Sequence, residues 1–454
     1  MLTWGGTRAA QDGADGDRRL GLDSATALVI AEIIGVGIFL TPAGMARDLG
    51  SPFWVLMVWL AVGAAVLCGS LCYGELAARF PEAGGGYVYL REAWGPGVAF
   101  LYGWKSLFVM DPGLTAALAA GLGQYAAAIV PIGGAGQKGV AIAVILALAG
   151  LSTLGVRVAG NVVRGLAVVK LVLLGAIIVL GFASAHGAWS NFLPFVAPRP
   201  GSGPLLAGLA GGILGAFFAF GGFWDVAKIG GEIRDPTRTL PRALAIGIGV
   251  ATLAYILTSG AFIRLVPIAS AASGPAFAAQ AGLTLFGAQG ARIFALVVLI
   301  AVAGSLAAVI LCAPRVSYAM ARDGLLPASL GRLHPRFGTP VRAIALQAIL
   351  ACAVVALATF DAILGYFVFV TVAFVALTVA GIYRLPRPAA GTFRVPGYPW
   401  TPVGFLLLLV TLLALLAAGR PREGALGVCV VALGYPVYRL VLAPRAARLV
   451  GEAP

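Results

Sequence analysis

Six of the charged residues inside the long apolar runs of this sequence have the side chains best suited to chemistry. They are Glu32, Lys105, Asp111, Lys170, Asp225 and Lys228. A charge in a low-dielectric surrounding is costly, so each group needs a partner, a proton or a bound ligand. Glu32, Asp111, Asp225 and Lys228 are therefore candidates for proton or charge coupling.

A structural ion pair is the alternative for each acid. Asp225 stands three residues before Lys228 and is also suited to cap a short helix. Glu32 and Asp111 have no basic neighbour at helical spacing, but we expect at least one of them to pair with Lys105, Lys170 or Lys228.

The residue types needed for catalysis or metal binding are scarce. The two histidines, His186 and His334, lie far apart, and no pair of cysteines stands near either. All five cysteines fall inside apolar segments, which does not resemble a disulfide framework. We therefore expect no catalytic residues, no metal site and no cofactor, and we do not expect an enzyme.

The composition indicates whether the segments that carry these charges lie in water or in lipid. Of 454 residues, 60% are hydrophobic and 11% are charged, and the mean hydropathy is +0.98. A soluble domain is about half apolar and about a quarter charged. We expect an all-α membrane protein. The net charge of +14 does not indicate nucleic acid, because the charges lie mainly in short loops between apolar runs.

About 12 apolar runs are long enough to span a bilayer, which takes ~20 residues each. They cover residues 25–46, 53–78, 97–128, 138–156, 161–185, 205–234, 241–265, 290–321, 341–359, 361–384, 401–419 and 425–442. An even number puts both termini on one side, and most arginines then lie on that side. The positive-inside rule predicts that this side is the cytoplasm.

Two of these runs are interrupted at their centres by glycine pairs. The first contains Gly35-Val36-Gly37 and the sixth contains Gly221-Gly222. Unwound backbone inside a membrane is tolerated where it lines a cavity or is buried in protein, and paired interruptions point to a transporter binding site. Free N–H groups there suit a carboxylate and free carbonyls suit an ammonium, so an amino-acid backbone fits both. The alternative is that these glycines only pack helices.

Three longer motifs resemble the amino acid–polyamine–organocation (APC) superfamily. The stretch Phe218–Leu244 contains Phe-Ala-Phe-Gly-Gly and then Leu-Pro-Arg-Ala, and it is similar to the sixth helix and following loop of that superfamily. Arg315–Ile344 resembles the end of its eighth helix, and Pro81–Trp104 resembles its second-to-third-helix segment. The third helix, Trp104 to Tyr125, is similar to the L-type amino acid transporter branch.

The resemblance implies a LeuT-type fold, in which two inverted repeats of five helices are followed by two additional helices, and helices 1 and 6 are broken. The implied segments are a cytoplasmic tail (1–24), the first repeat (25–185), the second repeat (205–384), helices 11 and 12 (401–442) and a second cytoplasmic tail (443–454).

The resemblance also implies a substrate site at the two breaks. Its residues would be Ile33, Gly35, Val36, Gly37, Phe218, Ala219, Phe220, Gly221 and Gly222. N–H groups around Val36 and Gly37 would hold the carboxylate, and carbonyls of Ile33, Phe218 and Ala219 would hold the amino group, with Phe218 as an aromatic gate. Val36 stands where the family commonly has a small hydroxyl residue, so one hydrogen bond to the carboxylate is missing.

Lys170 matches a fifth-helix lysine of sodium-independent family members. There the ammonium resembles a substitute for a sodium ion, which here would lie near the carbonyls of Ala31 and Ile34 and the hydroxyl of Ser305. A lysine that extends to the membrane surface is the alternative. Glu232, with the arginines that follow it, is interpreted as part of a cytoplasmic gate, or otherwise as part of a solvated loop.

These observations predict a secondary active transporter that moves amino acids across a plasma membrane, the inner membrane of a bacterium, by alternating access. Transport would be sodium-independent, by exchange or by proton symport, so the partners are the amino acid, the bilayer and, in symport, protons. The outer loop Pro131–Lys138 has no cysteine, which implies no disulfide-linked heavy-chain subunit. A polyamine or cationic amino acid carrier and an amino-acid sensor on a transporter scaffold are the alternatives.

Overall fold

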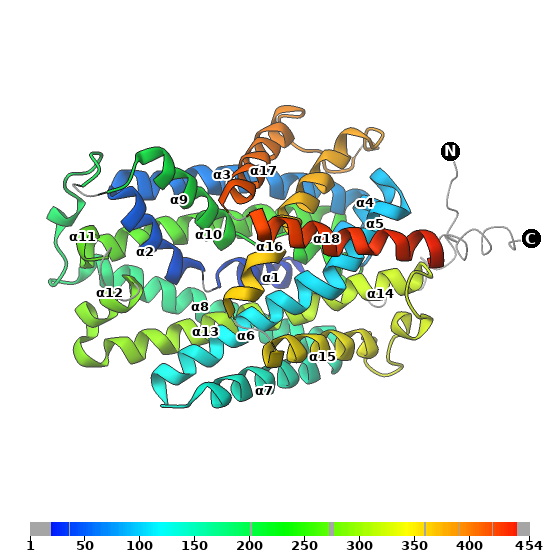
Figure 1. Ribbon diagram of the computed structural model, residues 1–454, viewed down its shortest axis with the longest axis horizontal. Coiled ribbons are helices and arrows are strands. Elements are labelled where there is room, and N and C mark those ends of the chain that lie inside the picture. Colours follow the sequence, from blue (N-terminus) through cyan, green and yellow to red (C-terminus); the bar gives the residue numbers. More distant parts are fainter. Residues whose placement is uncertain are drawn as a thin grey trace, which may run out of the picture.

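The computed structural model describes residues 20–35, 37–199, 202–271, 277–357, 360–389, 391–419 and 421–442. Every named secondary-structure element in these ranges is a helix, and most helices run along the long axis of an elongated bundle (Figure 1). One isolated backbone bridge joins Leu20 to Ile233.

The helices follow one another with short connections. The first half contains α1 (Leu22–Ile33), α2 (Gly37–Leu49), α3 (Pro52–Arg79), α4 (Gly86–Trp94), α5 (Pro96–Lys105), the π-turn η2 (Ser106–Met110), α6 (Asp111–Ile129), α7 (Gly134–Thr153) and α8 (Val156–Ala183). The second half contains α9 (Leu205–Ala219), the 3-10 helix η4 (Asp225–Glu232), α10 (Pro236–Leu265), α11 (Ile268–Ala271), α12 (Phe277–Phe286), α13 (Gly290–Cys312), α14 (Pro314–Arg322), α15 (Val341–Leu357), α16 (Phe360–Ala380), α17 (Trp400–Gly419) and α18 (Pro421–Val437).

Seven helical stretches in the described chain are long and apolar enough to cross a membrane. They are Pro52–Arg79, Pro96–Ala127, Gly134–Thr153, Val156–Ala183, Pro236–Leu265, Gln280–Arg322 and Trp400–Gly419. The pair α1 and α2, bent by 44° at their junction, makes an eighth candidate. Shorter apolar helices are Leu205–Ala219, Val341–Leu357, Val368–Tyr383 and Gly424–Leu440. The predicted all-α, multi-pass membrane architecture is confirmed.

Small residues bring the central helices close together. A Cβ atom added at Gly63 of α3 would lie 2.6 Å from the side chain of Thr252 on α10, and one at Gly69 would meet the ring of Phe405 on α17. Close backbone approach of this kind favours membrane helix packing, where the hydrophobic effect between helices is absent. In the same way α1 packs among α8, α10 and α13, and α2 packs on α9.

Candidate functional site

The first helix break lies between α1 and α2. Ile34 has non-helical backbone angles (φ −76°, ψ 79°), and the N–H of Gly35 donates to the carbonyl of Ile33 at 2.8 Å. Val36 lies outside the described residues. A Cβ at Gly37 would lie 2.7 Å from the Cα of Ala219. The start of α2 therefore touches the end of α9, where the second break begins.

The second break follows α9. The N–H groups of Phe220 and Gly221 turn back to the carbonyls of Ala216 and Phe218, at 3.0 and 3.1 Å. Gly222 then takes a φ of +102°, a conformation that favours glycine. A Cβ there would lie 3.1 Å from the Cβ of Glu32. Both helices break at the predicted glycine pairs, and the two breaks face each other.

Tyr255 of α10 joins the two breaks, and the sequence analysis missed it. Its buried hydroxyl lies 2.8 Å from the carbonyl oxygen of Ile33 and 2.8 Å from that of Ala219. A phenol has one hydrogen to donate, so the two carbonyls share it. These are two of the three carbonyls that the resemblance assigns to a substrate ammonium. A single tyrosine in an apolar run carries no sequence signal that separates it from core packing.

The two aromatic residues of the second break have different surroundings. Phe220 is buried, and its ring packs against Trp59 and Tyr255, with centroid distances of 6.1 and 5.0 Å. Phe218 is partly buried. Of the two, Phe218 is therefore the more accessible ring.

Lys170 of α8 reaches the first break from the side. Its ammonium donates to the carbonyl of Ala31 at 3.1 Å and to the hydroxyl of Ser305 on α13 at 3.2 Å. The Ser305 hydroxyl in turn lies 2.6 Å from Ala31 O and 3.5 Å from Ile34 O. Lys170 is 2% exposed and points inward. A cation thus lies beside the Ala31 carbonyl and the Ser305 hydroxyl, and Ser305 links this position to the carbonyl of Ile34.

Lys228 of η4, the short helix that follows the second break, lies between two carboxylates. Its Nζ is 2.8 Å from Oδ1 of Asp111 on α6 and 2.8 Å from Oδ1 of Asp225, one turn earlier in η4. The contact to Asp111 has hydrogen-bond geometry, whereas the Asp225 oxygen, at the same distance, lacks that geometry and forms an ion pair. All three side chains are buried. The expected pairing of at least one of the two acids with a lysine is present as Asp111–Lys228.

Glu32 and Lys105 have no partner of this kind. In the described part of the chain, both carboxylate oxygens of Glu32 are buried without a hydrogen-bond partner. The Lys105 ammonium lies 2.8 Å from the sulfur of Met110, and 4.6 and 5.8 Å from the ring centroids of Tyr102 and Phe374. Aromatic faces attract a cation but do not neutralise its charge.

Glu232 lies at the end of the bundle that holds α4 and α14. Its carboxylate accepts hydrogen bonds from Nε and Nη2 of Arg315, at 3.1 and 3.3 Å, and Arg315 is 1% exposed. Next to it the backbone of Leu20 pairs with the strand-like segment after η4, through Leu20 N–Glu232 O at 3.1 Å and Arg234 N–Leu20 O at 2.9 Å. The start of α1 and the end of η4 are therefore linked directly.

A second ion cluster closes the same end. Asp323 accepts from Arg91 and from the hydroxyl of Tyr87, each at 2.7 Å, and Arg91 also contacts Glu82 at 3.1 Å. Burial alone would lower the pKa of Arg91, but the carboxylates of Asp323, Glu82 and Glu92 together outweigh it and raise that pKa. The Arg91 guanidinium therefore keeps its positive charge, and the cluster holds α4 against the end of α14.

Comparison with known proteins gives three relevant similarities. The serine/threonine exchanger SteT of Bacillus subtilis is 29% identical over 433 residues, covering 93% of this chain and 96% of that protein. The large neutral amino acids transporter small subunit 2 of Homo sapiens is 28% identical over 437 residues, covering 93% and 80%. An uncharacterized transporter of Mycobacterium tuberculosis is 34% identical over 378 residues, covering 81% and 80%.

A family model described as amino acid permease matches residues 20–428, which includes both helix breaks and the Lys170 position. The matched relatives that have a described activity are amino acid transporters rather than enzymes. The apolar helices and the paired breaks agree with that activity. The chain therefore belongs to the amino acid permease family of the APC superfamily, a family of membrane transporters.

Proposed function

We propose that this chain is a sodium-independent carrier of α-amino acids that works by alternating access. The observation that carries the proposal is the Lys170 ammonium, held between the Ala31 carbonyl and the Ser305 hydroxyl beside the first break. A fixed ammonium supplies the positive charge that a bound sodium ion would otherwise supply to these oxygens. Transport then needs no sodium.

The substrate backbone would bind between the two breaks. The first N–H groups of α2 are unpaired within that helix and suit a carboxylate. The carbonyls of Ile33 and Ala219 suit the amino group, and they already share the single hydroxyl hydrogen of Tyr255. The substrate ammonium therefore shares these carbonyls with the Tyr255 hydroxyl or displaces it. Phe218, being half-buried, is suited to close over the substrate.

The proposed architecture has twelve membrane-crossing units. Eight candidate spans and four shorter apolar helices support that number. The contact of α2 with α9 and of α1 with η4 supports two related repeats, 25–185 and 205–384, followed by 401–442. The distribution of arginine supports cytoplasmic tails at 1–24 and 443–454 and a location in a bacterial inner membrane. No cysteine in Pro131–Lys138 supports function without a disulfide-linked subunit.

Exchange of neutral amino acids is the favoured mode. SteT, which matches over nearly its whole length, is named a serine/threonine exchanger. The two carboxylates that would favour a polyamine or cationic carrier, Asp111 and Asp225, are both occupied by Lys228. One observation favours proton symport as a second candidate: the Glu32 carboxylate is buried with no hydrogen-bond partner in the described chain, so it can take up a proton without breaking a hydrogen bond.

The test uses purified protein in liposomes loaded with labelled serine. External amino acids are supplied one at a time, with sodium or with choline as the cation. We expect counterflow with small neutral amino acids in both buffers. Lys170→Ala should lose it or acquire a cation requirement, whereas Lys138→Ala, at an exposed lysine, should not. Uptake by the wild type that disappears in choline would refute the sodium-independent mechanism.

A further inference from the structure

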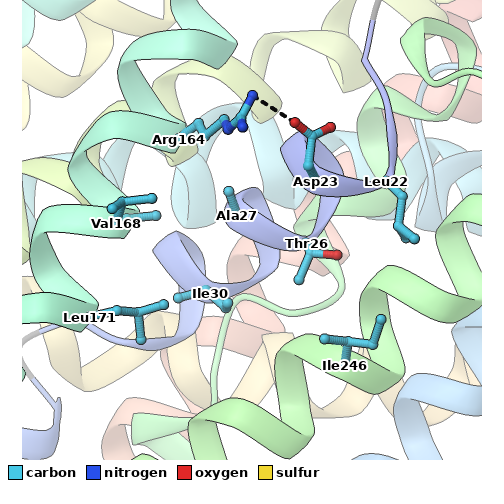
Figure 2. Close-up of a pocket in the computed structure, with 10 residues that line it drawn as sticks. Leu22, Asp23, Thr26, Ala27, Ile30, Arg164, Val168, Leu171 and Ile246 are labelled. Carbon is cyan, nitrogen blue, oxygen red and sulfur yellow. Dashed lines mark ion pairs between the residues drawn. The ribbon is translucent and has the colours of Figure 1, made fainter. Parts of the chain in front are cut away.

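An apolar groove of about 670 Å³ lies on the outside of the bundle, between α1, α8 and α10 (Figure 2). Val168 and Leu171 of α8 form one wall, Ile30 of α1 forms the floor, and Ile246 of α10 forms the opposite wall. The polar atoms at its edge are concentrated at one end, where Asp23 and Arg164 meet.

A second apolar hollow of about 200 Å³ continues the first. It also includes Leu171 and extends between α8 and α10 past Ile178 and Leu257. From Arg164 to Ile178 is 14 residues of α8, which at 1.5 Å per residue is ~21 Å. One leaflet of a bilayer has a hydrocarbon depth of ~15 Å. The combined furrow is therefore long enough for a complete acyl chain.

Both walls of the furrow belong to helices that are long and apolar enough to cross the membrane. Val168 is 54% exposed and Leu253 is 59% exposed, so this surface meets the hydrocarbon of the bilayer. At that depth the medium that fills an open apolar hollow is lipid and not water. The shape and the setting favour an acyl chain as the occupant.

The polar end selects a headgroup. The Arg164 guanidinium lies 2.6 Å from the Asp23 carboxylate, and both side chains are about half exposed. Arg242 is exposed one turn before Ile246, so it stands on the same side of α10, below the groove wall. Two guanidinium groups and one carboxylate leave a net positive charge. Arginine matches phosphate oxygens with paired hydrogen bonds.

We propose that the furrow between α1, α8 and α10 is a binding site for an anionic phospholipid. One acyl chain lies along Leu171 between α8 and α10, and the phosphate binds Arg164. Asp23 and the phosphate compete for the same guanidinium. Lipid binding therefore releases the ion pair that ties the start of α1 to α8, in the helix that carries the first break.

The test measures lipid binding to the full chain by native mass spectrometry in detergent. Phosphatidylglycerol is titrated against phosphatidylcholine with the same acyl chains. We expect phosphatidylglycerol to bind more tightly, and Arg164→Gln to weaken it about tenfold, as for one lost charge-assisted hydrogen bond. Asp23→Asn should strengthen it several-fold, because the competing carboxylate is removed. Leu253→Trp should weaken both lipids by filling the furrow.

Two matched controls stand on α13, away from the furrow. Arg292→Gln removes the same charge and Leu296→Trp adds the same ring at another exposed position, and neither should change binding. Equal binding of the two lipids, with loss only in Leu253→Trp, would show a furrow that takes acyl chains without headgroup selection and would overturn the proposal. So would an equal loss in Arg164→Gln and Arg292→Gln, or no loss in either Arg164→Gln or Leu253→Trp.

Discussion

The buried cluster of Asp111, Lys228 and Asp225 predicts a large and non-additive loss of stability when its central cation is removed. Each carboxylate oxygen is 2.8 Å from the same Nζ. At an effective dielectric of ~20 a contact at this distance gives ~6 kcal/mol of attraction, much of which offsets desolvation. Lys228→Met leaves two buried carboxylates facing each other, and removing one partner of a buried pair costs ~3–5 kcal/mol.

Asp111→Asn is the contrasting change. An amide oxygen can still accept from Lys228, and Asp225 still balances its charge, so the cost should be only ~1–2 kcal/mol. In the Lys228→Met background the same substitution removes a repulsive charge. It should then be neutral or restore stability, which gives a coupling of at least ~1–2 kcal/mol between the two sites.

The assay is thermal unfolding of detergent-purified protein, followed by tryptophan fluorescence at one fixed scan rate. At ~2 °C per kcal/mol, Lys228→Met should lower the Tm by ~6–10 °C. Lys138→Met, at an exposed lysine, is the matched control and should change it little. A loss in Lys228→Met no larger than in this control, or simple addition of the two single losses in the double variant, would refute the reasoning.

Three further predictions concern the two helix breaks and the end of the bundle that holds α4 and α14. Glu32→Gln breaks no hydrogen bond to any residue that the structure describes, so its Tm should hold. If Glu32 carries the coupled proton, the pH dependence of net uptake between about pH 5 and 8 should flatten in this variant while exchange persists. An unchanged pH profile would exclude Glu32 as the coupling group. Tyr255→Phe removes a donor shared by two buried carbonyls, which should lower the free energy of unfolding by ~1–3 kcal/mol and raise the KM for exchange. Unaltered Tm and KM would mean that the Tyr255 bridge is unimportant. Glu232→Gln leaves the buried Arg315 guanidinium without this anion, so amide hydrogen exchange at Leu20 and Arg234 should accelerate. Protection at these two amides equal to that of the wild type would contradict the expected loosening.

The helix breaks could be predicted because glycine pairs at mid-membrane leave a local signature. The positions of Gly37 and Gly222 followed from the apolar runs alone. The residues around Lys170 could be named only through the family resemblance, because Ala31 and Ser305 are ordinary helix residues in isolation.

Partner choice among the buried charges could not be predicted, because it depends on packing between distant helices. Asp111 pairs with Lys228, 117 residues away, although Lys105 is only one and a half turns distant on the same helical stretch. The local pair of Asp225 and Lys228 was visible because residues three apart align, and they do so most closely in a 3-10 helix such as η4. Tyr255 was missed because it looks like any core aromatic residue.

The bridge between Leu20 and Ile233 is made by main-chain atoms only. An alanine scan would therefore leave it intact and would assign it no energetic weight, however strongly it restrains the start of α1. Leu20→Pro deletes the donor of the Leu20 N–Glu232 O hydrogen bond, although it keeps the acceptor of the Arg234 N–Leu20 O bond. Replacing Leu20 by another non-proline residue leaves the backbone bridge intact. The choice of side chain is nevertheless limited, because the Leu20 side chain lies against Gly160 of α8. The backbone tether and the side-chain contact at one residue can thus be separated by comparing Leu20→Ala with Leu20→Pro.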